Sequence, residues 1–290
     1  MIVAAAVVAG GPRAVVATSD PEGWADACAW RHGDDAHASD VELSDCLVDA
    51  CARIDELEAA VAAGAVPMVE PARWLPAVPW PRNVFGAPVN YLEHRGELGP
   101  DRSPAKGTTR ELGLFVKATG SVSGPDDPIV LPPWEGRECH YEGEVAIVIG
   151  RRGSDIPADR ALEHVAALTG ALDVTMRLEA DRREERSMRK SFRTFTPLGP
   201  ALLPMSRAGR LEDVALELSI DDEVRQRGTL AQLIVSVPEL VALASSVVEL
   251  RPGDVILTGT PAGVGPLAAG QRVRLTVTGL PALELDVVGA

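Results

Sequence analysis

The chain has 290 residues, of which 46% are hydrophobic, 24% charged and 4% aromatic. This composition is typical of a globular protein and excludes a disordered or fibrous one. The 28 basic and 42 acidic residues give a net charge of −14, which repels phosphate backbones and anionic lipids, so we expect no nucleic-acid partner. No stretch approaches the roughly 18 apolar residues that a membrane span needs. The apolar N-terminus lacks the basic region of a signal peptide, so we expect a cytoplasmic protein without membrane association.

Cysteine and lysine are both used sparingly. The four cysteines form no Cys-x-x-Cys pair and are too few for a disulfide framework, so we expect reduced thiols. Only three of the 28 basic residues are lysines, namely Lys106, Lys117 and Lys190. In a chain that otherwise uses arginine, a lysine either meets a need for a compact ammonium whose pKa can shift, or has been retained by chance.

The N-terminal part predicts a small α/β unit. Short apolar runs at 2–9 and 13–18, around a Gly-Gly-Pro turn, predict two strands. Apolar residues recur at spacings of three and four over 44–64, which predicts one helix. A proline-rich stretch follows and ends near residue 80, so we expect a small domain over 1–79 and a main domain over 80–290.

The remainder of the chain is rich in predicted strands. Short β-branched runs predict strands at 144–150, 213–220, 254–260 and 272–278. Helices are predicted at 158–169, 176–189 and 238–249. Because strands and helices do not alternate regularly, the pattern disfavours a doubly wound parallel sheet. It favours a strand-rich α+β fold, a mixed β-sandwich or barrel with peripheral helices.

Two glutamates stand at the start of the first of these strands. Residues two apart in a strand share a face, so Glu142 and Glu144 project the same way. An isolated Glu-x-Glu is most often a solvated face, but here Ala146 and Val148 continue that face as apolar residues. If the face is buried, two carboxylates need a cation or protonation. A hard divalent ion such as Mg²⁺ meets that need with oxygen ligands.

A third carboxylate, Asp173, lies in the otherwise apolar or small stretch 168–175. Unpaired burial of an ionised carboxylate there costs several kcal/mol or forces it to be neutral, so Asp173 is a candidate third ligand. The alternative is that it caps the helix predicted to start near Met176.

A histidine and a glutamate form a second candidate cluster. One helical turn would place Glu97 beside His94, the geometry of a carboxylate that orients a general base. A surface His–Glu pair is the alternative interpretation. The segment 96–113 is polar and rich in glycine and proline, which predicts a lid able to close over a site.

Further candidates could bind an anionic substrate. Arg177 and Lys190 flank the predicted helix 176–189, whose many arginines also fit a solvated face. The glycine-rich run 257–265 follows a predicted strand and can present backbone amides and the Thr260 hydroxyl to a carboxylate. It lacks the Gly-Lys-Ser/Thr ending of a phosphate loop, which argues against nucleotide binding.

Several motifs in register resemble the fumarylacetoacetate hydrolase family from about residue 80 to the C-terminus. They are Asn90-Tyr91-x-x-His94-x-x-Glu97, Tyr141-Glu142-Gly143-Glu144, Leu172-Asp173-Val174-Thr175-x-Arg177, Lys190-Ser191-Phe192, Pro197-Leu198-Gly199-Pro200, Val224-Arg225-Gln226 and the run Pro252–Gly265. The resemblance implies a mixed β-sandwich roll with peripheral helices and a homodimer. It also implies a bound Mg²⁺, Mn²⁺ or Ca²⁺ ion.

The resemblance also implies residue roles. The metal ligands would be Glu142, Glu144 and Asp173. The base dyad would be His94 and Glu97, and Lys190 would stabilise an oxyanion. Arg177, Gly259 and Thr260 would contact the substrate carboxylate.

From these roles we expect a metal-dependent hydrolase that cleaves a C–C bond in a 2-oxo or β-dicarbonyl acid, of the acylpyruvate or fumarylacetoacetate type, through a metal-stabilised enolate. The alternatives are a decarboxylase, a hydratase or isomerase, a biosynthetic cyclase or dehydratase, or a non-catalytic metal-binding homologue. Ala180 and Arg193 stand where many members have glutamine and aspartate, which favours a larger or more anionic substrate.

Overall fold

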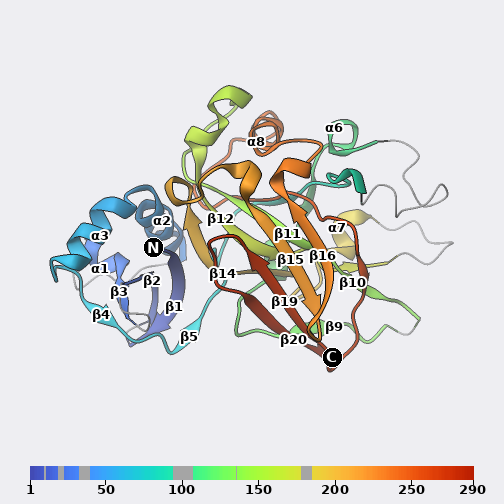
Figure 1. Cartoon of the computed structure of the whole chain (residues 1–290), viewed down its shortest axis with the longest axis horizontal. Helices are drawn as coiled ribbons and strands as arrows, with labels where there is room; N and C mark the ends of the chain where they lie inside the picture. The colour runs from blue at the N-terminus through green and yellow to red at the C-terminus, as the bar shows by residue number, and fades with distance from the viewer. Residues whose placement is uncertain (10, 19–22, 33–39, 94–106, 135, 178–184) are drawn as a thin grey trace.

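The computed structural model describes the chain except for residues 10, 19–22, 33–39, 94–106, 135 and 178–184. Within the described residues, the strands form sheets of twelve, five and three strands, and the helices lie at the periphery (Figure 1). This arrangement confirms the predicted strand-rich α+β class. None of the helices in this described part is both long and apolar enough to cross a bilayer.

The large sheet runs from the N-terminal unit into the centre of the molecule. In spatial order its strands are β4 (Met68–Val69), β3 (Trp24–Asp26), β2 (Gly11–Ala17), β1 (Val3–Val8), β14 (Thr196–Pro204), β12 (Val165–Leu172), β11 (Gly143–Ile149), β17 (Val255–Leu257), β6 (Val84–Gly86) and β7 (Phe115–Lys117). Beside this path, β5 (Arg73–Trp74) pairs with β1 and β8 (Val122–Ser123) pairs with β14.

The other elements complete the sandwich. The five-stranded sheet is β16 (Glu223–Thr229), β15 (Ala215–Ile220), β19 (Arg272–Val277), β20 (Leu283–Gly289) and β9 (Ile129–Leu131). The small sheet is β13 (Thr175–Met176), β10 (Cys139–Tyr141) and β18 (Gly265–Pro266). The α-helices of the described residues are α1 (Ala27–His32), α2 (Asp40–Ala52), α3 (Ile54–Ala62), α6 (Thr109–Leu112), α7 (Arg186–Arg189) and α8 (Val237–Ser245).

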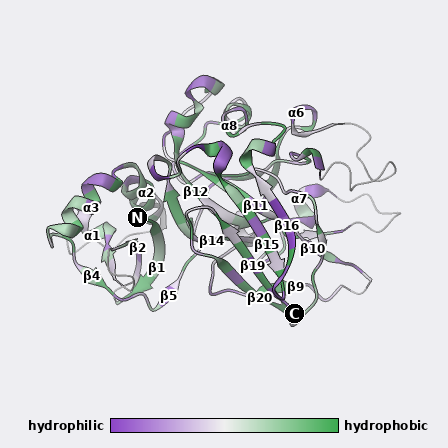
Figure 2. Cartoon of the chain, in the orientation of Figure 1, coloured by the Kyte–Doolittle hydropathy of each residue, from purple (hydrophilic) through white to green (hydrophobic). Residues whose placement is uncertain are grey.

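Strand β11 is buried on both faces, which explains its continuous apolar sequence. Val145, Ile147 and Ile149 pack in a core that also contains residues of β15, β19 and β20. Ala146 and Val148 belong to a second core, shared with α2 and the N-terminal strands. In Figure 2 the central strands are largely hydrophobic, whereas β16, at the edge of the five-stranded sheet, is hydrophilic.

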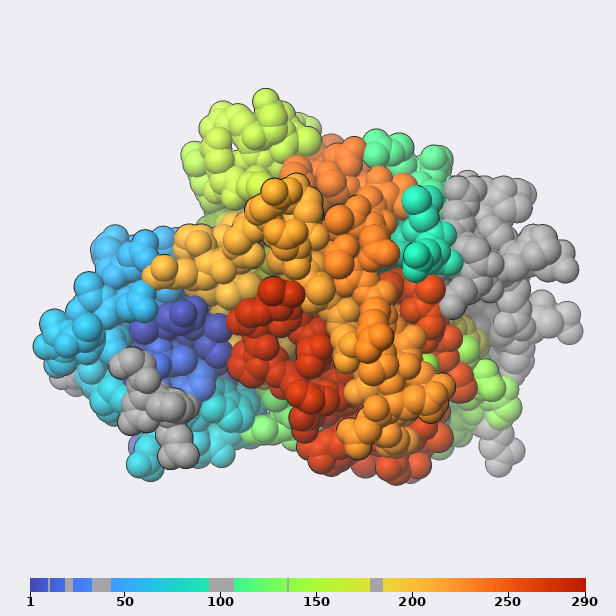
Figure 3. Space-filling model, in the orientation of Figure 1, coloured from blue at the N-terminus to red at the C-terminus, as the bar shows by residue number. Residues whose placement is uncertain are grey.

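The N-terminal unit is joined to the rest through a strand pair and an ion-pair cluster. Val3 of β1 lies opposite Leu202 of β14. The Arg207 guanidinium bonds to Asp55 at 2.5 Å and to Glu58 at 2.6 Å, and Figure 3 shows these two parts of the chain in contact. The division into 1–79 and 80–290 stays a prediction.

Three helix predictions differ from the structure. The stretch 158–169 forms a 3-10 helix over Ala158–His164 and then β12, because the small apolar residues of that strand fit between β11 and β14. The helix predicted over 44–64 is two helices that meet at Arg53. In the stretch 176–189, predicted as one helix, Met176 belongs to β13 and only Arg186–Arg189 of the described residues form a helix, α7.

Candidate active site

Three carboxylates meet where β11 begins. Glu142 precedes the strand, Glu144 is its second residue, and Asp173 follows the end of β12. These strands are antiparallel, with Gly143 opposite Leu172, and the Asp173 amide donates to the Glu142 carbonyl oxygen over 2.8 Å. The pairing brings one oxygen of each carboxylate within 4.8 Å of the others.

All three acidic side chains are buried. The exposed fractions are 6% for Glu142, 2% for Glu144 and 1% for Asp173. The interpretation of Glu142 and Glu144 as a solvated strand face is therefore wrong. The interpretation of Asp173 as a helix cap is also wrong, because Thr175–Met176 is a strand.

Two lysines supply most of the compensating charge. The Lys190 ammonium donates to Glu142 Oε2 at 2.8 Å, to Asp173 Oδ2 at 2.5 Å and to Thr175 Oγ1 at 2.6 Å. Lys117, which is fully buried, donates to Asp173 Oδ1 at 2.5 Å and to the Phe195 carbonyl oxygen at 2.8 Å. Burial lowers the pKa of Lys117, while the charge of Asp173 acts in the opposite direction.

Glu144 is the least compensated of the three carboxylates. Within the described residues, its hydrogen bond comes from the Gly259 amide at 2.6 Å, and no lysine or arginine contacts it. Burial, followed by the charges of Asp173 and Glu142, raises its pKa well above the ordinary value. A third buried carboxylate without its own cation requires a proton or an added cation. The all-oxygen donor set therefore fits a hard divalent ion.

The glycine-rich run after β17 closes one side of the site. Gly259 has φ +96°, and a Cβ there would lie 2.7 Å from the Asn90 Cβ, so only glycine fits without rearrangement. The Thr260 hydroxyl donates to the Gly143 carbonyl oxygen at 2.9 Å and accepts from Gln226 Nε2 at 2.8 Å. Because the Gly259 amide is directed to Glu144, its predicted contact with a substrate carboxylate stays a prediction.

The carboxylates open into a cavity of 180 Å³. Its described lining residues are Ala87, Pro88, Val89, Phe115, Glu142, Glu144, Asp173, Thr175, Arg177, Arg186, Arg189, Lys190 and Thr260. Arg177 donates to Glu142 Oε1 at 2.8 Å from the cavity wall. The structure thus brings together seven of the nine residues predicted for the site, counting Gly259 through its bond to Glu144.

The predicted base pair, His94 and Glu97, and most of the predicted lid over 96–113 lie outside the described residues. Asn90, which precedes this segment, is fixed by three hydrogen bonds. Asn90 is fully buried, donates to the carbonyl oxygens of Val235 and Thr258, and accepts from the Val235 amide. Asn90 therefore anchors the start of this segment next to the glycine-rich run.

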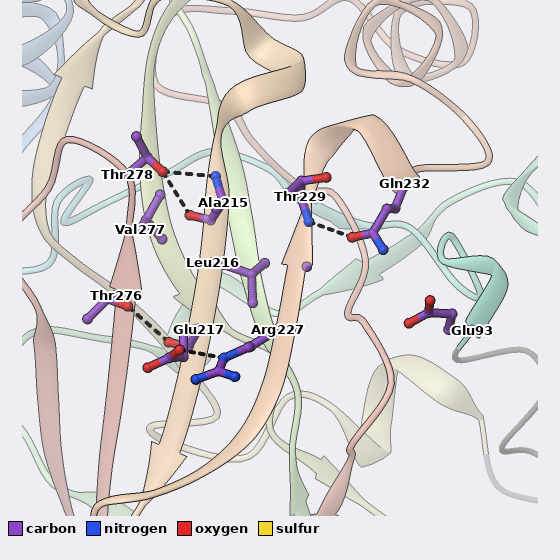
Figure 4. A pocket seen from close by; sticks show the side chains of 11 residues that line it. Glu93, Ala215, Leu216, Glu217, Arg227, Thr229, Gln232, Thr276, Val277 and Thr278 are labelled. Carbon is purple, nitrogen blue, oxygen red and sulfur yellow. Dashed lines mark hydrogen bonds and ion pairs between the residues drawn. The ribbon is translucent and has the colours of Figure 1, made fainter.

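A larger hollow of 630 Å³ lies elsewhere, on the β15, β16 and β19 surface (Figure 4). Its charged pair is internally satisfied, since Arg227 Nε lies 2.7 Å from Glu217 Oε2. The Thr278 hydroxyl and the Ala215 amide also bond to each other, at 2.9 Å. These polar groups of the larger hollow are therefore paired with one another. The cavity at the three carboxylates is smaller, but it is the better candidate active site.

Several cavity residues were not predicted. Lys117, which does not line the cavity but bonds to Asp173, was not predicted either; the rarity of lysine in this chain is the signal that could have pointed to it. Arg186 and Arg189 were included only in a stretch whose many arginines favoured a solvated face. Phe115 and Thr175 carry no local pattern that singles them out. Arg193, which was expected to affect substrate choice, is exposed.

Comparison with known proteins shows what this chain is similar to. A family model described as Fumarylacetoacetate (FAA) hydrolase C-terminal matches residues 83–288. A maleylpyruvate hydrolase of Aquipseudomonas alcaligenes is 35% identical over 221 residues, 74% of this chain and 75% of the relative. A mitochondrial oxaloacetate tautomerase of Oryza sativa subsp. japonica is 36% identical over 210 residues, 70% of this chain and 88% of the relative.

A solved structure resembles the chain over its whole length. The crystal structure of maleylpyruvate hydrolase from Sphingobium sp. SYK-6 in complex with manganese(II) and pyruvate has a TM-score of 0.80 and 30% identity, with 100% of both chains covered.

Proposed function

The chain belongs to the fumarylacetoacetate hydrolase family, and on this premise we propose that it hydrolyses a C–C bond in a 2-oxo or β-dicarbonyl carboxylic acid with a divalent metal ion. The observation that carries the proposal is the buried group of three carboxylates at the base of a cavity rich in cationic side chains. A purely structural role does not account for Glu144, a third buried carboxylate that has no cation of its own among the described residues.

Glu142, Glu144 and Asp173 would hold the ion. When bound, a divalent ion supplies Lewis-acid stabilisation of negative charge on substrate oxygens. The known maleylpyruvate hydrolase complex with manganese(II) and pyruvate supports a 2-oxo acid as the substrate class and leaves the choice among Mg²⁺, Mn²⁺ and Ca²⁺ open.

The cationic side chains would orient the substrate and stabilise charge. Lys190 already donates to two of the carboxylates, so its positive charge lies beside the proposed metal ligands, where it would stabilise a substrate oxygen that becomes negative. Arg177 lines the same cavity and offers a guanidinium to the substrate carboxylate. Thr260 also lines this cavity.

His94 and Glu97 complete the proposed machinery. His94 would remove a proton from water, Glu97 would orient the imidazole, and the hydroxide would add to the acyl carbon. The C–C bond then breaks, and a proton returns to the carbon of the departing fragment. Decarboxylation or tautomerisation is the second candidate, favoured by the 36% identity to an oxaloacetate tautomerase.

The first experiment titrates Mn²⁺ into metal-stripped protein by calorimetry. We expect one site that is lost in Glu142→Gln and kept in Glu138→Gln, whose side chain is 68% exposed. Oxalate should then raise the unfolding temperature only when metal is present. Failure of the wild-type protein to bind metal would contradict the proposal.

The second experiment identifies the reaction. Acylpyruvates and oxaloacetate are incubated with the metal-loaded protein in ¹⁸O-labelled water, and the products are analysed by mass spectrometry. Hydrolysis places one label in the new carboxylate of the released acid, whereas decarboxylation and tautomerisation place none in a carboxylate. His94→Asn should abolish turnover and leave Mn²⁺ affinity unchanged. If the wild-type protein turns over none of these acids and His94→Asn leaves Mn²⁺ affinity unchanged, the protein is a non-catalytic metal-binding homologue. If the wild-type protein is active and His94→Asn keeps its turnover, His94 is not the base.

A further inference from the structure

A buried glutamine of the five-stranded sheet reaches the start of β11 in the large sheet. Gln226 lies on β16 and is 1% exposed. Its Oε1 accepts from the Gly143 amide at 2.8 Å. Its Nε2 donates to Thr260 Oγ1 and to the Pro261 carbonyl oxygen, both at 2.8 Å. Both N–H groups and the oxygen of this amide are therefore engaged, and they join β16 to β11 and to the glycine-rich run.

Gly143, which this glutamine contacts, stands between the two glutamates of the acidic group. Strand β17 pairs with β11 farther along, over Ala146–Val148. The buried peptide groups of Gly143 lie outside that pairing, and buried peptide groups need hydrogen-bond partners. Gln226 accepts from the Gly143 amide, and the Thr260 hydroxyl donates to the Gly143 carbonyl oxygen. Two side chains thus complete the hydrogen bonding of β11 at this residue.

The hydrogen bonds among these three residues form a closed ring. The orientation of the Gln226 amide is fixed, because its oxygen faces an N–H group and its nitrogen faces the Pro261 carbonyl. Gln226 is therefore the donor to Thr260, whose hydroxyl uses its own hydrogen for Gly143 at 2.9 Å. Loss of either side chain leaves buried polar groups of the ring without a partner, which costs free energy.

The packing around Gly143 brings the glutamine close to the backbone. A Cβ on Gly143 would lie 2.8 Å from Leu218 Cδ1 and 3.3 Å from Gln226 Oε1. The absence of a side chain at this position therefore allows β15 and β16 to approach the start of β11. The position of the peptide groups between the two glutamates is consequently set by a side chain of another sheet.

We propose that Gln226 is a positioning residue of the metal site. By fixing both peptide groups of Gly143, it holds Glu142 and Glu144 in the arrangement that a divalent ion requires. This inference rests on the proposed function, because it takes these glutamates as ligands of the ion. Partners that orient metal ligands typically change metal affinity by about 10–100-fold, so metal affinity reports this role without any turnover.

The test measures Mn²⁺ affinity by calorimetry. Gln226→Met removes the three hydrogen bonds without adding a charge, and we expect Mn²⁺ to bind about tenfold or more weakly. Thr260→Val should also weaken binding, because it opens the same ring, whereas Thr260→Ser keeps the hydroxyl and should retain most of the affinity. The double variant of Gln226→Met with Thr260→Val should lose less than the product of the two single fold-changes.

Two control variants separate positioning from loss of stability. Val224→Thr changes a side chain on the same strand that is 39% exposed. Val287→Ala leaves a cavity in the core under β20, in the same sheet. Urea denaturation measures the stability of every variant. Both controls should bind Mn²⁺ as tightly as wild type, although Val287→Ala should unfold at a lower urea concentration.

The possible results separate this inference from the proposed function. If the wild-type protein does not bind Mn²⁺, the proposed function fails, and the inference fails with it. If the wild-type protein binds Mn²⁺ but folded Gln226→Met binds it equally well, or if Val287→Ala loses as much affinity as Gln226→Met, only the positioning role is disproved. If Gln226→Met does not fold, Thr260→Val decides, since an unchanged Mn²⁺ affinity in that variant disproves the role of the ring.

Discussion

The ammonium nitrogen of Lys190 lies 2.5 Å from Oδ2 of Asp173, a residue 17 positions earlier in the chain. Glu142 Oε2 is 2.8 Å from the same nitrogen. Lys190 therefore acts as an internal counter-ion for two of the three carboxylates. A divalent ion held by the same carboxylates would be repelled by this ammonium, so the lysine weakens metal binding while it places a donor beside the substrate.

Replacement of Lys190 should separate these two effects. In Lys190→Met we expect Mn²⁺ to bind about tenfold or more tightly, because the competing charge is gone, and turnover to be lost. Calorimetry measures the affinity and product formation measures the turnover. Unchanged or weaker Mn²⁺ binding would show that Lys190 organises the carboxylates and does not compete with the ion.

Lys117 should stabilise the protein through Asp173. Because both side chains are buried, loss of one partner leaves an uncompensated charge, and Lys117→Met should destabilise the metal-free protein by about 3–5 kcal/mol. Urea denaturation measures this change. The double variant with Asp173→Asn provides the control, since it should lose less than the sum of the two single variants. Additive losses would contradict the coupling.

The stability of the metal-free protein should depend on pH through Glu144. Its raised pKa means that the folded state holds this proton more tightly than the unfolded chain. The stabilisation is therefore complete below the ordinary value of 4.5 and is lost as pH rises through the raised pKa. Thermal unfolding in the presence of a chelator should show a smaller decline in Glu144→Gln than in wild type. Identical pH profiles would exclude this contribution.

Two glycines allow a matched test of crowding at the site. Gly259 and Gly270 have similar φ values, +96° and +91°, but a Cβ would meet Asn90 only at Gly259. Gly270→Ala should cost about 1–2 kcal/mol for its backbone conformation. Gly259→Ala should cost about 1–3 kcal/mol more for the overlap and weaken Mn²⁺ binding through Glu144. Equal losses of stability in the two variants would argue against crowding.

Much of the fold was predictable from local patterns. Alternation and β-branched runs identified β11, β15, β17 and β19 within a few residues, because each strand has a face that must be buried. The stretch 158–169 was mistaken for a helix, since a run of small apolar residues has the same appearance in a buried strand. Pairing with β11 and β14, which are separate segments of the chain, makes this stretch a strand.

The acidic group of the candidate site could also be inferred from sequence, whereas the pairing of each carboxylate with its partner could not. Glu142 and Glu144 share a strand face, and Asp173 stands out in apolar surroundings, so their burial and need for a cation follow from nearby residues. Lys117 reaches Asp173 across 56 positions and Gly259 reaches Glu144 across 115. Such contacts depend on strand order and register, and these are determined by the free energy of the whole folded chain. Local sequence pattern carries that information only weakly, and the tertiary structure alone decides which of these charges are paired.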